Sequence, residues 1–422
     1  RCGRLRSVSR PAQPGAPSER AIVYLMAGVQ FVNVLDFMMV NPLGPDLAES
    51  LAIPTSLLAA IAGTYTAAAS LSGLASAFLL DRFDRRAALV LALVGLALGT
   101  ALGGFATGLG SLLAARVVAG LFGGPATSLA FAIVADAIPA ERRGWAMGIV
   151  MGGFAVASVL GVPVGLKLAQ WGGFRLPFFG VGGLILVAAV AAWRILPRLD
   201  AHVARARAER RPLQALYGIV SKPVALASLS LTALTMMSGF ILIPNIAAFA
   251  QYNLGFPREH LDRMYLLGGV ASLVTTRLVG PLVDRFGSTR MALVGALMLV
   301  AVMWTGFVST LGAPVLAIMT AFFVAMSFRG VSYNTLVSKV PLSHERARFQ
   351  SVQSAVQHGA SAAAAFVSSA LLSELPDHRL VHVDRVAWIA IALSLAVPLV
   401  MLVVERTVLR RDAAAACEAS LS

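Results

Sequence analysis

The sequence is poor in charged residues. Asp, Glu, Lys and Arg make up 13% of its 422 positions, whereas hydrophobic residues make up 58% and the mean hydropathy is +0.80. Soluble domains use about 25% charged residues, so this composition excludes a water-soluble fold. Cysteine is also scarce. Cys2 and Cys417 lie near the two ends of the chain, and no structural disulfide is expected.

Motifs for nucleotide, metal or hydrolytic chemistry are missing as well. The sequence has no G-x-x-x-x-G-K-[ST] phosphate-binding loop, which argues against ATP-driven transport, and no H-E-x-x-H, C-x-x-C or G-x-S-x-G pattern. Its six histidines do not cluster as metal ligands. The sequence therefore predicts no enzyme, no cofactor and no metal site.

Long apolar runs are what the sequence has instead. Windows of roughly 18 or more apolar residues predict transmembrane helices, because a helix satisfies its own backbone polar groups within lipid. Such runs lie near 21–45, 57–80, 87–107, 110–136, 146–169, 175–196, 222–250, 264–283, 291–309, 313–338, 350–373 and 386–405. The expected fold class is an all-α polytopic membrane protein with 12 transmembrane helices.

Basic residues favour one side of these spans. With a cytoplasmic N-terminus, the inner segments hold 25 of the 34 Lys and Arg residues and the outer segments hold six. The asymmetry follows the positive-inside rule and predicts that both termini are cytoplasmic. The net charge of +14 is then explained by topology and anionic lipid headgroups rather than by nucleic acid.

Two pairs of short polar phrases mark an internal duplication. Asp81 in "LLDRFDRR" follows the second span, and Asp284 in "LVDRFGSTR" follows the eighth, 203 positions later. Glu141 in "PAERRG" and Glu345 in "LSHERARF" follow the fourth and tenth spans, 204 positions apart. The expected domains are a disordered tail 1–20, a six-helix bundle 21–196, a cytoplasmic linker 197–221, a second six-helix bundle 222–405 and a tail 406–422.

The paired phrases resemble the G-x-L-x-D-R-x-G-R-R signature of the major facilitator superfamily, and the resemblance covers about 21 to 405. The second copy, "GPLVDRFGSTR", fits in register, whereas the first has Ala77 and Asp84 at the two glycine positions. The resemblance implies two pseudo-symmetric six-helix bundles that rock about a central cavity. It also implies that inner-loop residues bias this motion, although topological anchoring is an alternative. These gating residues are Asp81, Arg82, Arg85, Glu141, Arg142, Asp284, Arg285, Arg290, Glu345 and Arg346.

The fifth span resembles the antiporter motif of twelve-helix drug:proton antiporters. Gly161, Pro163 and Gly165 match a G-V-P-x-G element. Glycines at i and i+4 allow another backbone to approach closely, and the proline permits a bend. The resemblance implies an exporter, with a role in packing alone as the alternative.

Asp36 is an acid well inside a span, where a lone charge needs a partner. Arg116 begins an R-x-x-x-G motif like that of the family and lies at a similar depth in the fourth span. We expect these two residues to face each other, with Asp36 as the proton-binding group. The alternatives are a static ion pair that fixes helix packing and a solvated Asp36 that reaches the interface near the outer end of its span. The substrate cavity is expected to be lined by Gln30, Asn33, Phe37, Asn41, Thr127, Phe240, Asn245, Arg329, Asn334, Ser354, Gln357, His358 and Ser361.

The sequence thus favours a monomeric transporter of the bacterial inner membrane that exports a drug, sugar or nucleoside in exchange for protons. Two alternatives stay open at this point. One is uptake by proton symport, and the other is a sensor on the same scaffold that transports nothing.

Overall fold

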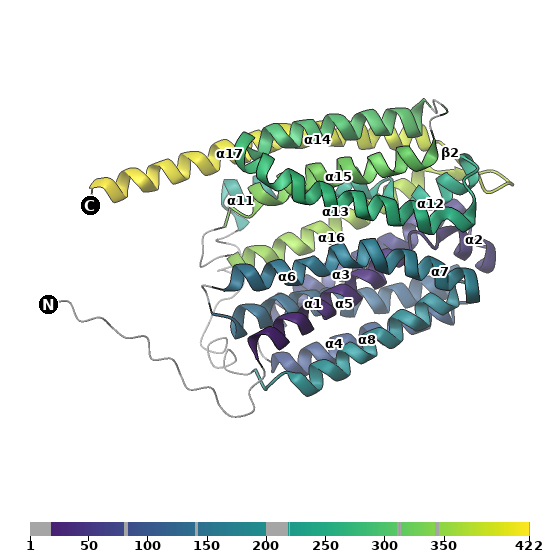
Figure 1. The fold of residues 1–422 in the computed structure, drawn as a ribbon, viewed down its shortest axis with the longest axis horizontal. Helices are drawn as coiled ribbons and strands as arrows, with labels where there is room; N and C mark the ends of the chain where they lie inside the picture. Colours follow the sequence, from purple (N-terminus) through teal and green to yellow (C-terminus); the bar gives the residue numbers. More distant parts are fainter. Residues whose placement is uncertain are drawn as a thin grey trace.

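The computed structural model describes residues 18–79, 83–139, 142–199, 218, 220–309, 312, 314–341 and 346–421, without the side chains of 77–79, 346–348 and 412–421. It consists of long helices that run side by side in two groups (Figure 1). The start of α1 and the end of α17 lie at the same end of the molecule (Figure 1).

The first half of the chain forms α1 (Glu19–Met39), α2 (Gly44–Leu51), α3 (Leu58–Leu79), α4 (Arg85–Gly104), α5 (Leu109–Ala137), α6 (Arg143–Val156), α7 (Val162–Gly172) and α8 (Arg175–Ile195), with a 3-10 turn at Thr55–Leu57 and a π-helical turn at Ala157–Gly161. The second half forms α11 (Pro223–Phe240), α12 (Ile246–Ala248), α13 (Leu261–Phe286), α14 (Ser288–Met303), α15 (Val315–Val337), α16 (Arg346–Leu371) and α17 (Val383–Leu421), with 3-10 turns at Ile243–Asn245 and Arg258–His260 and π-helical turns at Phe249–Asn253 and Trp304–Val308. The short strands β1 (Ser373–Glu374) and β2 (Leu380–Val381) pair as an antiparallel hairpin between α16 and α17.

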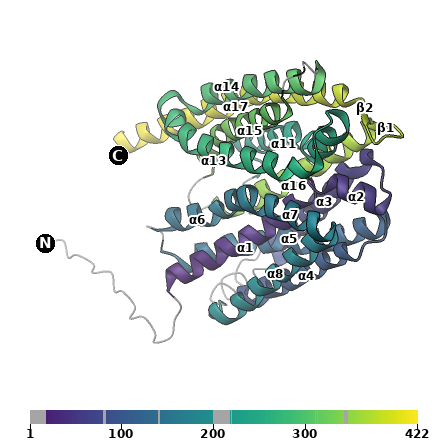
Figure 2. The ribbon, with the colours of Figure 1, turned by 45° about the vertical axis from the view of Figure 1, so that its right-hand side comes forward.

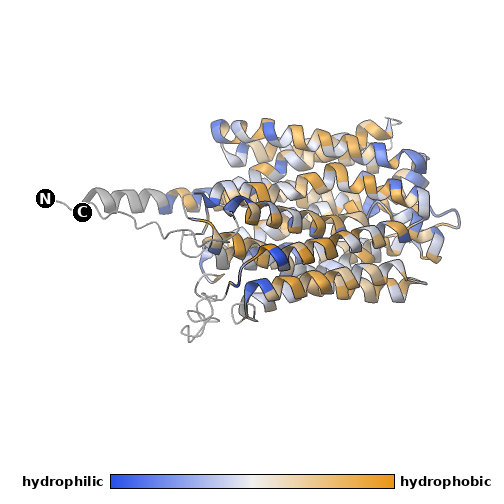
Figure 3. Cartoon of the chain, turned by 60° about the horizontal axis from the view of Figure 1, so that its bottom comes forward, coloured by the Kyte–Doolittle hydropathy of each residue, from blue (hydrophilic) through white to orange (hydrophobic). Residues whose placement is uncertain are grey.

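The number of long helices agrees with the sequence. Within the described residues, eleven helical segments are long and apolar enough to span a membrane. The helix α16, with 26 residues, is as long as these but carries many polar side chains. Figure 3 shows apolar residues along the helices and hydrophilic ones gathered near their ends. The prediction of an all-α, twelve-helix membrane fold is confirmed.

Two of the expected spans are interrupted rather than continuous. The run expected at 21–45 ends as a helix at Met39, and α2 begins five residues later at Gly44. The run expected at 222–250 leaves regular α-helix at Phe240 and passes through the 3-10 turn that contains Pro244. Pro42 and Pro244 each lack a backbone donor, so a regular helix does not continue through them. The two breaks fall in the first helix of each half.

The bundles meet along two pairs of helices. Helices α1 and α3 to α8 pack with one another, as do α11 and α13 to α17, and the strongest contacts between the groups join α3 to α16 and α7 to α13. Figure 2 shows α16 beside the first group and the α2 region next to the hairpin at the end away from the termini. The contact pattern gives two six-helix bundles with an interface between them.

Candidate functional site

The polar centre of the first bundle is a buried ion pair. Arg116 Nη1 on α5 lies 3.2 Å from Asp36 Oδ1 on α1, and the two side chains are 1% and 0% exposed. Arg116 Nη2 also donates to the Asp36 carbonyl oxygen at 3.4 Å. The structure thus brings together the two residues that the sequence placed at similar depth, although Asp36 lies one turn from the end of α1 rather than deep within a longer helix.

Neighbouring helices hold both partners of this pair. The Thr100 hydroxyl on α4 donates to Asp36 Oδ1 at 2.7 Å. The Arg116 guanidinium lies 4.4 Å from the ring centre of Tyr65 on α3, a cation–π geometry. Four helices therefore meet at one charge pair. Sequence reasoning missed Thr100 and Tyr65, since a lone hydroxyl or ring within an apolar run carries no motif.

A second polar contact lies one turn away on α1. The Asn33 amide donates to the Gly123 carbonyl oxygen at 3.0 Å and to the Thr127 hydroxyl. The Tyr65 hydroxyl donates back to Asn33 Oδ1 at 3.2 Å. The expected cavity residues Asn33 and Thr127 thus bond to each other, and Tyr65 links them to the ion pair.

Small residues on α5 allow α3 to approach this centre. A Cβ atom at Gly120 would lie 2.3 Å from the Tyr65 carbonyl oxygen, and one at Gly123 would lie 2.3 Å from the Tyr65 hydroxyl. A Cβ atom at Gly124 would lie 2.5 Å from the Ala69 carbonyl oxygen. The glycines after Arg116 therefore bring the backbone of α3 against α5.

Three aromatic rings connect this centre with the second bundle. Phe37, next to Asp36 in the chain, stacks on Tyr65 with ring centres 5.5 Å apart. It also stacks on Phe240 of α11 at 5.8 Å. We call Tyr65, Phe37 and Phe240 the aromatic column. The expected cavity residues Phe37 and Phe240 lie together in it.

Arg329, another expected cavity residue, is 1% exposed inside the second bundle. It donates to the hydroxyl groups of Ser238 at 2.7 Å and Ser394 at 3.2 Å, and to the Thr235 carbonyl oxygen at 3.2 Å. Its partners in the described part of the chain are therefore uncharged and belong to α11, α17 and, through the Met326 sulfur, its own helix α15. This arrangement places Arg329 in helix packing within the second bundle.

The remaining expected cavity residues are more dispersed. On α16, His358 Nδ1 lies 2.8 Å from the Ser354 carbonyl oxygen, and the Ser361 hydroxyl donates to the Gln357 carbonyl oxygen at 2.8 Å. Asn334 on α15 is exposed. The others are buried: Asn245 donates to the Ser368 hydroxyl at 2.9 Å, while the side-chain oxygens of Gln30 and Asn41 have no hydrogen-bond partner among the described residues.

The structure describes some of the expected gating residues but not all of them. Arg85 forms an ion pair of 2.7 Å with Asp136, and Arg142 forms one of 3.1 Å with Glu19. Both pairs join helix ends within the first bundle. In the second copy, Asp284, Arg285 and Arg290 are exposed. Asp81, Arg82, Glu141 and Glu345 lie outside the described residues, as does the side chain of Arg346.

Asp84 and Gly287 occupy equivalent places in the two copies of the repeated phrase. Asp84 is the N-cap of α4, and its carboxylate accepts from the backbone N–H of Arg86 at 3.2 Å and of Leu199 at 2.8 Å. Gly287 precedes α14 with φ +89°, which favours glycine. The first copy therefore replaces a glycine turn with a side-chain cap.

The expected close approach at the antiporter-like motif is only partly correct. A Cβ atom at Gly161 would lie 2.7 Å from the Leu35 side chain, but one at Gly165 would meet nothing within 4 Å. The backbone contact lies elsewhere, where a Cβ atom at Gly269 of α13 would lie 2.9 Å from Val159 Cα. Pro163 lies in the first turn of α7, directly after the π-helical turn, so the motif coincides with an irregular helical segment.

Hydrogen bonds hold the bundles together at the end away from the termini. Arg258 forms an ion pair with Asp46, and its Nε donates to Asp46 Oδ1 at 2.8 Å. The Tyr252 hydroxyl donates to Glu49 at 3.0 Å, and the Thr55 hydroxyl donates to a carbonyl oxygen of the hairpin. We call the contacts Asp46–Arg258 and Glu49–Tyr252 the outer seal, after the side of the membrane on which the basic asymmetry of the sequence predicts this end. The sequence alone does not predict it, because its partners are more than 200 positions apart and match no motif.

On the hairpin, Arg379 hydrogen-bonds to Asp377 and lowers the pKa of that carboxyl.

Within the described residues, no group of three or more His, Cys, Asp and Glu side chains could hold a metal ion.

Comparison with known proteins gives one family. The family model described as "Major Facilitator Superfamily" matches residues 26–365. The chain is 27% identical over 319 residues to a chloramphenicol resistance protein of Streptomyces lividans, which covers 75% of this chain and 80% of that protein.

Solved structures show the same fold. The crystal structure of a D-xylose-proton symporter has a TM-score of 0.72 at 17% identity and covers 90% of this chain and 97% of that one. A bacterial homologue of the human lysosomal transporter Spinster, in an inward-facing and unoccupied conformation, has a TM-score of 0.70 at 16% identity and covers 93% and 98%.

Proposed function

The chain belongs to the Major Facilitator Superfamily, and from this premise we propose that it exports a small organic molecule across the bacterial inner membrane in exchange for protons. In this proposal it acts as a monomer with both termini in the cytoplasm. The observation that carries it is the buried pair of Asp36 and Arg116. The similarity to a chloramphenicol resistance protein supports export of a drug-like compound over uptake.

The ion pair supplies the means of coupling. A charge pair inside a bundle is stable only while both partners stay charged and in contact, because each is costly to bury alone. A proton on Asp36 removes its charge and leaves Arg116 with the Tyr65 ring and the Asp36 carbonyl oxygen. The two protonation states therefore favour different packing of α1 against α5. Substrate is exchanged for a proton if the substrate favours one of these packing arrangements and the proton favours the other.

The driving force is sufficient for this work. One proton crossing 100 mV supplies about 2.3 kcal/mol, to which any pH gradient adds. By the population-shift argument, a ligand moves an equilibrium only by its differential affinity for the two states. In this proposal, the proton that binds Asp36 supplies this difference in affinity.

The aromatic column supports an amphiphilic or aromatic substrate. Phe37 touches Tyr65, which contacts Arg116, and also touches Phe240 of the other bundle. Stacked rings offer apolar faces that bind flat organic groups. A substrate that separates Phe37 from Phe240 would act directly on the contact between the bundles, which links its binding to their relative motion.

The outer seal agrees with a state open toward the termini. Alternating access requires the contacts at Asp46 and Glu49 to break when the bundles rock. The family resemblance assigns the inner-loop residues the opposite task, which is to stabilise closure on the cytoplasmic side. Each set of contacts then exists in one state only.

A direct test uses purified protein in proteoliposomes that hold a pH-sensitive dye. Chloramphenicol, sugars and nucleosides are added outside the vesicles in turn. The Asp384→Asn variant is the control, because Asp384 is an exposed acid at the start of α17. The proposal expects substrate entry to move protons outward. Protons that enter together with the substrate would establish symport and overturn export by exchange.

A further inference from the structure

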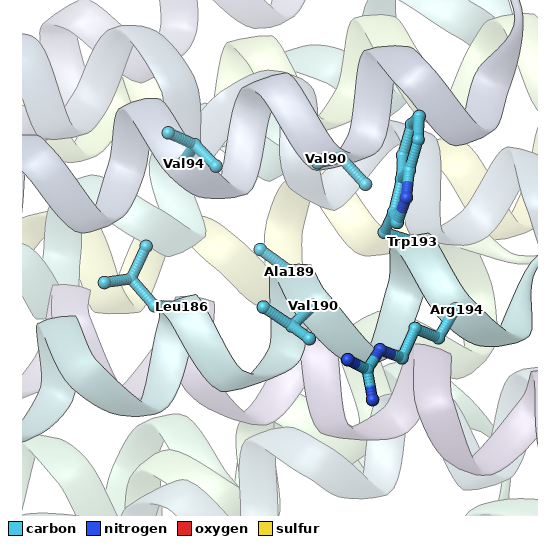
Figure 4. A pocket seen from close by; sticks show the side chains of 7 residues that line it. All are labelled: Val90, Val94, Leu186, Ala189, Val190, Trp193 and Arg194. Atoms are coloured by element: carbon cyan, nitrogen blue, oxygen red, sulfur yellow. The ribbon is translucent and has the colours of Figure 1, made fainter.

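An apolar groove lies on the surface of the first bundle where α4 and α8 pack together, at the end of the helices near the termini. Its volume is about 310 Å³. Figure 4 shows the side chains that line it, among them Val90 and Val94 on α4 and Leu186, Val190, Trp193 and Arg194 on α8.

We propose that this groove binds an anionic phospholipid of the adjacent leaflet, with an acyl chain along the valines and the phosphate group on Arg194. The groove faces outward, since Val190 and Trp193 are each 54% exposed. Its walls are apolar along α4 and α8 and become basic only at the end of α8, where Arg194 lies in the last helical turn. A phospholipid matches this arrangement, because its acyl chain is apolar and its charged phosphate group lies at one end.

Trp193 and Arg86 add to the basic end of the groove. The Arg86 guanidinium lies 4.2 Å from the Trp193 ring centre and donates to the Trp193 carbonyl oxygen. Tryptophan is enriched at the level of the lipid headgroups, and basic pockets between transmembrane helices bind anionic headgroups. Arg86 Nε is buried and has no hydrogen-bond partner among the described residues, so Arg86 contributes its positive charge to this end.

The neighbouring acid offsets at most one of the two arginine charges at this end. Asp84 accepts from the backbone N–H groups of Arg86 and Leu199 as the cap of α4. Arg194 and the Arg86 guanidinium therefore present positive charge where a headgroup would lie. A zwitterionic lipid would gain the apolar contact but little from this charge.

The test measures quenching of Trp193 fluorescence by phospholipids with brominated acyl chains, taken as the difference between the wild-type protein and Trp193→Phe. Dibrominated phosphatidylglycerol should reach half-maximal quenching at a lipid fraction about fivefold lower than the fraction that dibrominated phosphatidylcholine needs. This factor is the one expected from a single basic side chain at the membrane surface. Arg194→Gln should remove this preference and Arg194→Lys should keep it. Val190→Phe should weaken quenching by both lipids.

The matched control is Arg406→Gln, which removes an exposed arginine from α17 and should leave the preference unchanged. Equal quenching by the two lipids in the wild-type protein would overturn the proposal. So would a preference that survives Arg194→Gln, or one that is lost equally in Arg406→Gln. Because Arg194→Lys keeps the charge and the length of the side chain, its behaviour separates loss of lipid binding from loss of fold.

Discussion

Gly120 on α5 lies directly against the backbone of Tyr65 on α3, so that a Cβ atom there would stand 2.3 Å from the Tyr65 carbonyl oxygen. This contact sets the position of the ring that covers Arg116. Gly120→Ala should therefore push the two helices apart and lower the free energy of unfolding by about 1–3 kcal/mol, the usual cost of overpacking. Denaturant titration in mixed micelles measures the change.

Gly110→Ala on the same helix is the control for this substitution. A Cβ atom at Gly110 has no neighbour within 4 Å, and alanine favours helix over glycine by about 1 kcal/mol. The control variant should be as stable as the wild type or more so. Equal stability of the Gly120→Ala and Gly110→Ala variants would contradict the tight contact.

Removing Arg116 should leave the Asp36 carboxylate buried without its counter-charge. We expect Arg116→Gln to lower the free energy of unfolding by about 3–5 kcal/mol, as for other broken buried pairs. The double variant Asp36→Asn/Arg116→Gln should recover part of this loss, because it removes both charges. A double variant that loses the sum of the two single losses would show that the residues act independently.

Asp84 should contribute to stability as a helix cap. Asp84→Ala removes the acceptor for two backbone N–H groups, and a lost N-cap costs about 0.5–2 kcal/mol. Asp84→Asn keeps an acceptor oxygen and should lose less. Thermal unfolding of the two variants in one detergent distinguishes them, and an Asp84→Ala variant of wild-type stability would exclude the capping role.

The outer seal should open during transport. In a background without Cys2 and Cys417, the pair Asp46→Cys/Arg258→Cys can be joined by a short thiol cross-linker, because the native side chains are in contact. The cross-linked protein should not transport, and a cross-linker cleaved by reduction should restore activity. Each single cysteine variant, treated in the same way, is the control. Transport that continues in the cross-linked protein would mean that the bundles need not separate there.

The sequence predicts the helical fold well because lipid imposes it. Long apolar runs, the basic asymmetry and the repeated phrases each follow from one strong physical constraint, and the chain has the expected helices. The breaks after Met39 and Phe240 were missed, since hydropathy stays high through Pro42 and Pro244. Proline marks both breaks, but it could not have located them alone, because α5, α13 and α17 each continue through an internal proline.

Only the charged residues of the candidate site can be predicted from the sequence. Asp36 and Arg116 stand out because a buried charge needs a partner, and the structure places them in contact. Tyr65, Thr100 and the outer seal depend on which helices pack together, which the sequence does not state. Gly165 shows the converse, since a motif glycine predicted a close contact that lies instead at Gly269.

The most direct test of the central claim is release of protons on substrate binding, measured with the purified protein in weakly buffered detergent solution. If Asp36 is the proton-binding group, a transported substrate should release protons from the wild-type protein and from Asp384→Asn, but none from Asp36→Asn that still binds it. Proton release of wild-type size from an Asp36→Asn variant would contradict the account and move the coupling to another residue.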